Sequence, residues 1–194
     1  DMEFTAGSFV VAGTAMALDG AAVEFCQGLS RQITFGLLHM GATERLKRLC
    51  ATDEHTGLRS RESFQEKLAD EMRRVRRYGN SLSLLVLEID GLAALRDGYG
   101  AETAEGVISV AGKVLRDNLR GTDCGAVWGW GRFVALLTET SAPGARATAQ
   151  RLRQLMAAAS AHHGARRIVF TASLGVATLE SPDEEPDRLL TRAE

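Results

Sequence analysis

The sequence of 194 residues has few side chains that could cross-link the chain or bind a transition metal. Its three cysteines, Cys26, Cys50 and Cys124, are odd in number and lack the CxxC or Cys/His spacing of a zinc site. The four histidines are scattered, and His162-His163 falls in an expected loop without a partner at ligand spacing. We therefore expect free cytosolic thiols, no metal site and no cofactor.

The sequence also lacks a large excess of charge and a long apolar run. Its 23 basic and 25 acidic residues give a formal charge of -2, which argues against a nucleic-acid coat or a polybasic membrane anchor. The longest apolar run near the N-terminus, residues 8–18, is about half of what a membrane span needs. The opening Asp-Met-Glu lacks the basic character of a signal peptide. We expect a cytoplasmic protein with no membrane span and no nucleic-acid partner.

What the chain does contain is enough apolar material for a core. Hydrophobic residues make up 45% and charged residues 25%, which suits a soluble domain that needs no disulfide or metal. Apolar residues between positions 21 and 38 recur at helical spacing, and residues 43–50 resemble a charged connecting helix. We expect residues 1–50 to form a helical N-terminal extension and linker helix, and residues 51–194 to form the main domain.

Residues 51–194 alternate helix and strand signals. A first helix, ended by Gly79-Asn80, is predicted from four apolar residues spaced four, four and three apart: Phe64, Leu68, Met72 and Val75. A second helix runs from about Val107 to Leu119 with Gly121 as its expected C′ residue, a third carries Leu152, and the last opens near residues 183–187. Strand signals lie at 81–89, 126–130, 133–138 and 167–179, the middle two as a hairpin with glycines at its tip. This alternation predicts a sheet covered by helices.

Four stretches together resemble the GGDEF (diguanylate cyclase-like) domain family. Residues 53–64 (DEHTGLRSRESF) are similar to the family's opening D-x-L-T-G-L-x-N-R-x-x-F. Residues 87–105 are similar to its D-x-D-x-F-K-x-x-N-D-x-x-G-H-x-x-G-D segment, and residues 173–178 (SLGVAT) to its S-I-G-V-A strand. Residues 128–133 (WGWGRF) occupy the place of the signature Y-G-G-D-E-F, and order and spacing agree at all four places.

The resemblance implies a mixed α/β, α+β-like fold with a central, largely antiparallel five-stranded sheet surrounded by helices. Family members condense two GTP molecules into cyclic di-GMP with two divalent ions, which two carboxylates hold against the triphosphate. Here Glu88 stands at the first metal-binding aspartate, one methylene longer, while Gly131 and Arg132 replace the acidic pair of the signature. We expect this degenerate GWGRF member to hold no metal.

The positions that contact the nucleotide in the family are also changed. Trp130 follows Gly129 in place of the second glycine and puts an indole where phosphates approach the backbone, with simple packing as the plainer interpretation. Arg96 stands for the guanine-binding asparagine, and Glu105 for its aspartate partner. We therefore expect no catalytic residue and no cyclase activity.

One family motif keeps its register. The product-binding R-x-x-D lies five residues before the signature, as Arg120 and Asp123 do here, and Arg151 stands about where the family often adds an arginine. A guanidinium can bind guanine or a phosphate in bidentate fashion. The alternative interpretation is structural, because an arginine suits a helix end and an aspartate suits a turn.

Three functions remain open at this stage. The first is a cyclic di-GMP receptor in bacterial signalling, with cyclic di-GMP as regulatory ligand at Arg120, Asp123 and Arg151. The second is a nucleotide-independent scaffold that forms a homodimer through its N-terminal helices and docks a protein effector. The third is GTP binding without cyclisation, with Arg96 and Arg132 as phosphate counter-charges.

Overall fold

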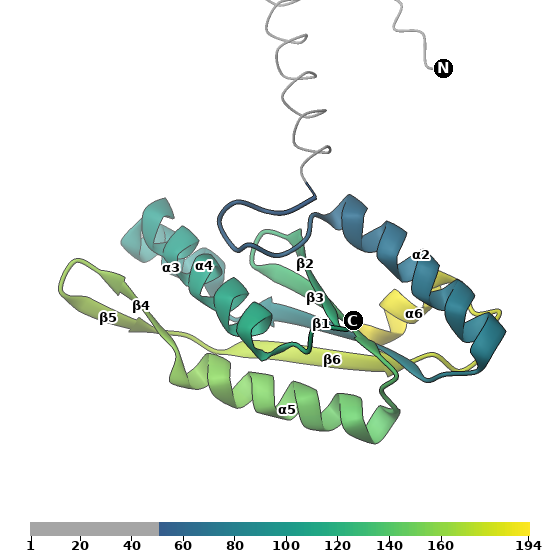
Figure 1. Ribbon diagram of the computed structural model, residues 1–194. Helices are drawn as coiled ribbons and strands as arrows, with labels where there is room; N and C mark the ends of the chain where they lie inside the picture. The colour runs from purple at the N-terminus through teal and green to yellow at the C-terminus, as the bar shows by residue number, and fades with distance from the viewer. Residues whose placement is uncertain (1–50) are drawn as a thin grey trace, which may run out of the picture. The chain divides into compact units, whose positions relative to one another are not determined.

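The computed structural model describes residues 51–194, in which helices and strands alternate (Figure 1). In chain order the elements are α2 (Arg61–Tyr78), β1 (Leu82–Ile89), α3 (Leu92–Tyr99), α4 (Ala101–Asn118), β2 (Cys124–Gly129), β3 (Arg132–Thr138), α5 (Ala142–Ala158), β4 (Ser160–His163), β5 (Arg166–Val169), β6 (Ala172–Thr178) and α6 (Pro186–Ala193). Among these residues no helix has the length and apolar character to cross a bilayer. The predicted N-terminal helices and the dimer they would form lie outside the described residues.

Helix α2 ends where its sequence predicts, and the structure shows in addition how it begins. Ser60 caps its N-terminus by accepting a hydrogen bond from the backbone N–H of Ser63 at 3.3 Å. Gly79 ends it in a left-handed conformation (φ 73°), which glycine adopts at little cost. The predicted apolar face is buried against the sheet through Phe64, Leu68, Met72 and Val75. The prediction for this helix is confirmed.

A four-stranded sheet in the order β2-β3-β1-β6, with all neighbours antiparallel, forms the centre of the described part of the chain. Strand β1 lies between β3 and β6, and its side chains are buried except that of Glu88. The five-strand expectation is therefore wrong for these residues, because β4 and β5 pair only with each other. An apolar run indicates extended backbone but does not identify its pairing partner.

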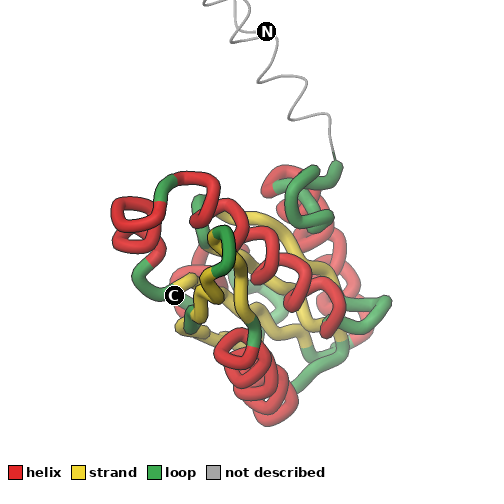
Figure 2. The backbone as a smooth tube through the Cα atoms, turned by 90° about the vertical axis from the view of Figure 1, so that its left-hand side faces the viewer, coloured by secondary structure: helices red, strands yellow, loops and turns green. Residues whose placement is uncertain are grey.

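Helices cover both faces of the sheet. On one face α4 and α5 pack through residues such as Val107 and Leu152, and on the other α2 and α6 pack through Phe64 and Leu189. Figure 1 shows α3 and α4 next to each other, α5 running along β6, and α2 on the other side of the picture, and Figure 2 shows helices on both sides of the strands. The mixed α/β class with a largely antiparallel sheet surrounded by helices is confirmed.

The region between α5 and β6 differs from the sequence prediction. His162-His163 lies in strand β4 and not in a loop, with Gly164 (φ 56°) in the turn to β5. The extended run 167–179 is two strands, because β5 pairs with β4 whereas β6 pairs with β1. Short strands such as these are set by their partners, and hydrophobic periodicity does not report partners.

Candidate functional site

The β2–β3 hairpin ends in a tight turn at Trp130-Gly131, between the paired residues Gly129 and Arg132. Gly131 has a left-handed backbone (φ 70°), and a Cβ there would lie 2.2 Å from Cδ2 of Leu92. Its carbonyl accepts a hydrogen bond from the backbone N–H of Ile89 at 3.0 Å. This position therefore requires glycine in the observed conformation, which confirms that the hairpin has glycines at its tip.

A cation lies among carboxylates where β1 and β3 meet. Glu88 is exposed on β1, directly opposite Arg132 on β3 and Ser173 on β6. The Nη2 of Arg132 is 2.9 Å from Oε1 of Glu194, at the end of α6, while its buried Nε has no hydrogen-bond partner. The guanidinium thus places a positive charge at this end of the sheet, where it pairs with Glu194, on the strand position directly across from Glu88.

Trp130 and Arg96 contact each other at the hairpin tip. The indole is 52% exposed, and the guanidinium carbon of Arg96 lies 5.1 Å from its ring centroid, within cation–π range. Arg96 also pairs with Asp97 at 3.2 Å, and Glu105 is exposed on α4. The structure therefore joins Arg96 to Trp130, and both predicted phosphate counter-charges, Arg96 and Arg132, already have protein partners.

One polar cluster beside Glu88 was missed by the sequence analysis. The carboxylate of Asp90 accepts hydrogen bonds from the hydroxyls of Thr171 at 2.6 Å and Ser173 at 2.8 Å. These bonds tie the end of β1 to β6, and no local pattern predicts them because the partners lie some 80 residues apart in sequence. Within residues 51–194, no three His, Cys, Asp or Glu side chains gather as a metal ion would need.

The segment from Arg120 to Asp123 is a turn held by its own hydrogen bonds. The backbone N–H of Asp123 donates to the carbonyl of Arg120 at 3.0 Å, and the Asp123 carboxylate accepts from the N–H groups of Arg120 (3.1 Å) and Thr138 (3.2 Å). The expected role of Gly121 as C′ residue is wrong. Helix α4 ends at Asn118 and is capped by Leu119 in extended conformation, and Gly121 does not adopt the left-handed backbone of a C′ glycine.

Two cavities flank this turn and share Arg120 and Asp123 in their walls. The smaller, about 300 Å³, also contains Arg151, Thr140 and Thr148. The larger, about 440 Å³, lies on the side of α2. The structure therefore brings Arg120, Asp123 and Arg151, which the sequence analysis selected from two places in the chain, to one cavity.

Arg151 is held against the end of α4. Its Nη1 donates to Oδ1 of Asn118 at 3.0 Å and its Nη2 donates to the carbonyl oxygen of the same residue at 2.9 Å. The Nδ2 of Asn118 in turn donates to the carbonyl of Val114 at 2.9 Å. Two of the five N–H groups of the guanidinium are thus used, and three remain for another partner.

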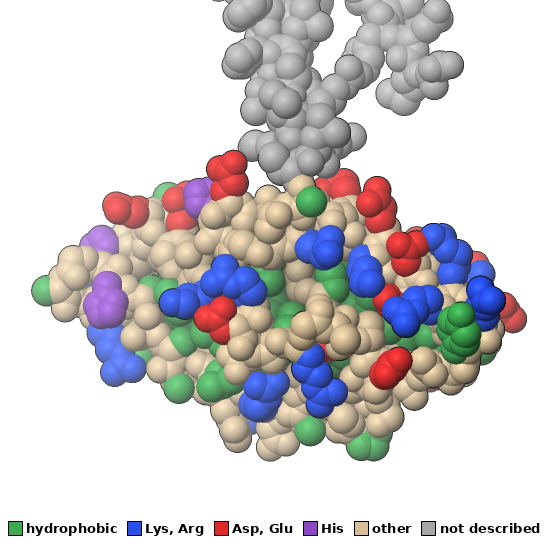
Figure 3. All heavy atoms as spheres, in the orientation of Figure 1, with side chains coloured by type: hydrophobic (Ala, Val, Ile, Leu, Met, Phe, Trp, Pro, Cys, Tyr) green, Lys and Arg blue, Asp and Glu red, His purple; other side chains and the backbone are tan. Residues whose placement is uncertain are grey.

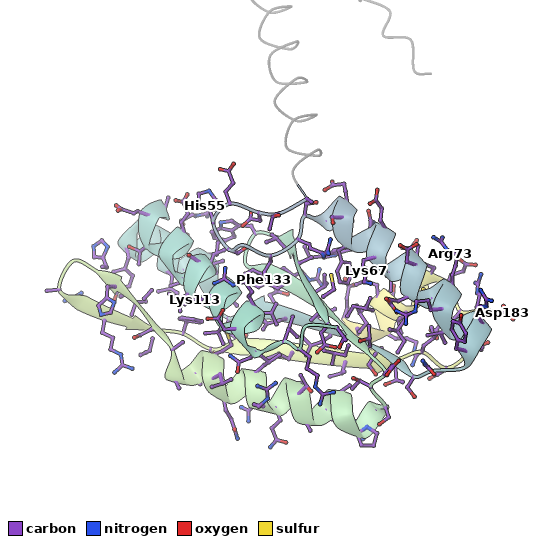
Figure 4. All side chains as sticks on the ribbon, viewed as in Figure 1. His55, Lys67, Arg73, Lys113, Phe133 and Asp183 are labelled. Carbon is purple, nitrogen blue, oxygen red and sulfur yellow. The ribbon has the colours of Figure 1, made fainter. Side chains whose placement is uncertain are left out.

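The larger cavity has basic walls whose charges are partly neutralised. Lys67, which projects from α2 in Figure 4, and Arg74 pair with the buried carboxylate of Glu71 at 2.7 Å and 3.1 Å. Burial tends to raise the pKa of Glu71, but the hydrogen bonds and charges of Lys67 and Arg74 outweigh it and the pKa is lowered. Figure 3 shows basic side chains spread across this face, with acidic side chains along its upper edge and among the basic ones.

Cys124 lines the larger cavity as a free, buried thiol. Burial raises the pKa of this thiol despite the nearby charges of Arg59 and Lys67. The thiolate, which is the reactive form, is therefore disfavoured. Cys26 and Cys50 lie outside the described residues.

Sequence comparison identifies relatives of the described region. Residues 50–194 match the family model for the GGDEF domain of diguanylate cyclases. Diguanylate cyclase DgcP of Pseudomonas aeruginosa is 34% identical over 148 residues, covering 73% of this chain and 22% of that protein. The cyclic di-GMP phosphodiesterase NbdA of the same organism is 28% identical over 148 residues, covering 76% of this chain and 19% of that protein. The chain spans about a fifth of the length of these two relatives.

Solved structures show the same fold. Diguanylate cyclase SiaD of Pseudomonas aeruginosa, solved with its activator SiaC, superposes with a TM-score of 0.71 at 24% identity, covering 89% of this chain and 66% of that one. The coiled coil and GGDEF domain of DgcB from Caulobacter crescentus, solved with c-di-GMP, gives a TM-score of 0.70 at 21% identity, covering 87% of this chain and 90% of that one. Because the family model covers most of the sequence and these folds agree, the chain belongs to the GGDEF domain family.

Proposed function

We propose that this chain is a catalytically silent GGDEF domain that acts as a receptor for cyclic di-GMP. The observation that carries the proposal is the convergence of Arg120, Asp123 and Arg151 on one cavity of about 300 Å³. Two of these residues belong to one turn and the third to α5, so their meeting is a property of the fold. We assign ligand binding to this cavity. The bound ligand would signal by changing the protein surface around it.

The chemistry of the cavity suits the ligand. Arg120 and Arg151 are exposed cations whose guanidinium groups can bind a phosphate or the Hoogsteen edge of guanine in bidentate fashion. Each carboxylate oxygen of Asp123 accepts one backbone N–H, and a carboxylate has about four acceptor positions in all. Asp123 therefore keeps acceptor capacity toward the guanine N1–H and amino group.

The residues at the hairpin do not fit the divalent ions of the cyclase reaction. Magnesium in such sites is held by carboxylates and substrate phosphates at close to octahedral geometry. Here Glu88 is opposed by Arg132, and the guanidinium of Arg132 is already paired with Glu194. A fixed cation at this point repels a metal ion and gives it no ligand, so we derive no catalytic step.

Isothermal titration of the chain with cyclic di-GMP tests the receptor proposal. We expect binding by the unchanged chain and a loss of about tenfold or more in affinity for Arg120→Ala, since a charge-assisted contact is removed. Arg153→Ala is the matched control, because Arg153 is an exposed arginine on α5 outside both cavity linings. No binding at about 100 µM ligand by the folded chain would reject the proposal.

The proposed lack of cyclase activity is tested by a separate assay for cyclic di-GMP formation. The chain incubated with GTP and magnesium or manganese should form no cyclic di-GMP above the level of a reaction without protein. A turnover within the usual enzymatic range of about 1 s⁻¹ or faster would contradict it. A matched cyclase such as DgcP serves as the positive control.

A nucleotide-independent scaffold is the second candidate, and the turn itself favours it. Both oxygens of Asp123 already accept backbone N–H groups, so the R-x-x-D motif has a structural role without any ligand. A fold relative, SiaD, was solved with its activator SiaC, so a chain with this fold can bind a protein. Sedimentation velocity with and without cyclic di-GMP separates the two: a ligand-independent dimer without binding supports the scaffold.

A further inference from the structure

We propose that Asn118 is a positioning residue of the cyclic di-GMP site, which holds the guanidinium of Arg151 in place for the ligand's anionic group. The inference rests on the proposed function and deepens it, because it states which residue outside the cavity organises the site. Asn118 does not line either cavity. It would act through Arg151.

The contacts of Asn118 fix both its own amide and the guanidinium beside it. Donation from Nδ2 to the carbonyl of Val114 leaves Oδ1 as the atom that faces Arg151. Oδ1 and the backbone carbonyl oxygen of Asn118 then accept from the two terminal nitrogens of Arg151. One residue thus holds both ends of the guanidinium fork, which is otherwise an exposed and flexible side chain.

A guanidinium held in this way is preorganised to bind an anion. Asn118 is neutral, so it orients the positive charge of Arg151 without cancelling it, and three N–H groups stay free. A ligand therefore meets a cation that has already lost much of its rotamer freedom, which lowers the ordering cost of binding. The same contact made by an acidic residue would orient Arg151 but neutralise its charge.

Two of the three basic residues that line only the larger cavity are placed differently, while the third, Arg59, donates to Oγ of Ser63 at 2.9 Å. Lys67 and Arg74 both pair with Glu71, a buried carboxylate with a lowered pKa that stays ionised at neutral pH. An anion in the larger cavity would compete with this carboxylate for the same cations. In the smaller cavity, Arg151 is held in one orientation and still has N–H groups that can donate to a ligand. This difference favours the smaller cavity as the anion site, although the other cavity is larger.

A double-mutant cycle tests the inference. Affinity for cyclic di-GMP is measured for the unchanged chain, Asn118→Leu, Arg151→Ala and the double variant, with Lys67→Met as the control on the α2 side. We expect Asn118→Leu to bind about fivefold more weakly and Arg151→Ala about tenfold more weakly, and the double variant to match Arg151→Ala. Lys67→Met should stay within about twofold of the unchanged chain.

Salt dependence gives a readout that a merely structural role would not reproduce. Arg151→Ala removes a charge and should flatten the dependence of log Kd on log salt, whereas Asn118→Leu keeps the charge and should leave the slope unchanged. Melting temperatures of all variants verify folding, and Asn118→Ala repeats the cycle with a smaller side chain.

The possible results distinguish failure of the positioning role from failure of the receptor proposal. If the unchanged chain binds but Asn118→Leu binds equally well, or its effect adds fully to that of Arg151→Ala, the positioning role is overturned while the receptor proposal stands. A large loss of affinity in Lys67→Met would overturn the choice of cavity. Absence of binding by the unchanged chain overturns both proposals together.

Discussion

Glu71 shows what a single carboxylate contributes to this fold. It is buried on α2, and its hydrogen bonds to Lys67 and Arg74 hold its pKa below the ordinary value against the opposing effect of burial. A carboxyl group whose pKa is lower in the folded than in the unfolded state stabilises the fold above the unfolded value of about 4.3. That contribution is lost as the pH falls below this value and through the lower folded value.

We therefore expect Glu71→Gln to lower the free energy of unfolding by about 1 kcal/mol at pH 7. The difference from the unchanged chain should shrink as the pH falls below about 4 and the native carboxylate becomes protonated. Urea unfolding at a series of pH values measures it. Glu66→Gln on the exposed side of the same helix is the control and should have no effect. An equal difference at pH 7 and pH 3 would contradict the assignment.

At the scale of elements, α4 is the helix on which the segment before α2 rests. Arg116 donates to the carbonyl of Thr56 at 3.0 Å, and Ser109 donates to the carbonyl of His55 at 3.1 Å. Gly112 lies between these contacts, and a Cβ there would meet Cβ of Thr56 at 2.5 Å. The close approach of this segment to α4 therefore depends on glycine at position 112.

Two glycine-to-alanine substitutions in α4 should change the free energy of unfolding in opposite directions. Gly112→Ala forces Thr56 away from the helix, and we expect a loss of about 1–3 kcal/mol in unfolding free energy. Gly106→Ala adds a methyl group where no atom lies within 4 Å, and should raise the stability by about 0.5–1 kcal/mol through helix propensity. Thermal or urea unfolding of the two variants provides the comparison. Stabilisation by both would mean that the segment does not pack on α4 in solution.

For some elements, local sequence patterns were sufficient to predict the structure. The apolar face of α2 follows from spacing alone, and its C-terminal end follows from Gly79, because these signals are local. The number of strands in the sheet could not be obtained in this way. Whether an extended run joins β1 or a neighbouring ribbon depends on partners far away in sequence, as the change at residues 170–171 between β5 and β6 shows.

The candidate site, too, could be predicted from the sequence only in part. Arg120, Asp123 and Arg151 were found through a family register, and the structure gathers them around one cavity, while ligand binding there stays a prediction. The residues that organise the site were missed. Asn118 contacts Arg151 across 33 sequence positions, and Arg132 pairs with Glu194 at the far end of the chain, so neither contact leaves a periodic signal.

At the scale of the whole molecule, ligand binding should appear as added stability. A ligand that binds only the folded state stabilises it by about 2.7 kcal/mol at a hundredfold excess over Kd. We expect cyclic di-GMP to raise the melting temperature of the chain, and Arg120→Ala to reduce that shift. GTP should give no shift, and stabilisation by GTP but not by cyclic di-GMP would instead favour the third function, nucleotide binding without cyclisation.

The turn from Arg120 to Asp123 has a consequence for how quickly a partner could be captured. Its internal hydrogen bonds and its tie to Thr138 are made entirely by protein groups. A molecule that docks on it would not need to fold a loop, so little conformational entropy is lost and encounter need not wait for a rare open state. We therefore expect the backbone of this turn to change little on binding, and the association rate not to be limited by the opening of a loop.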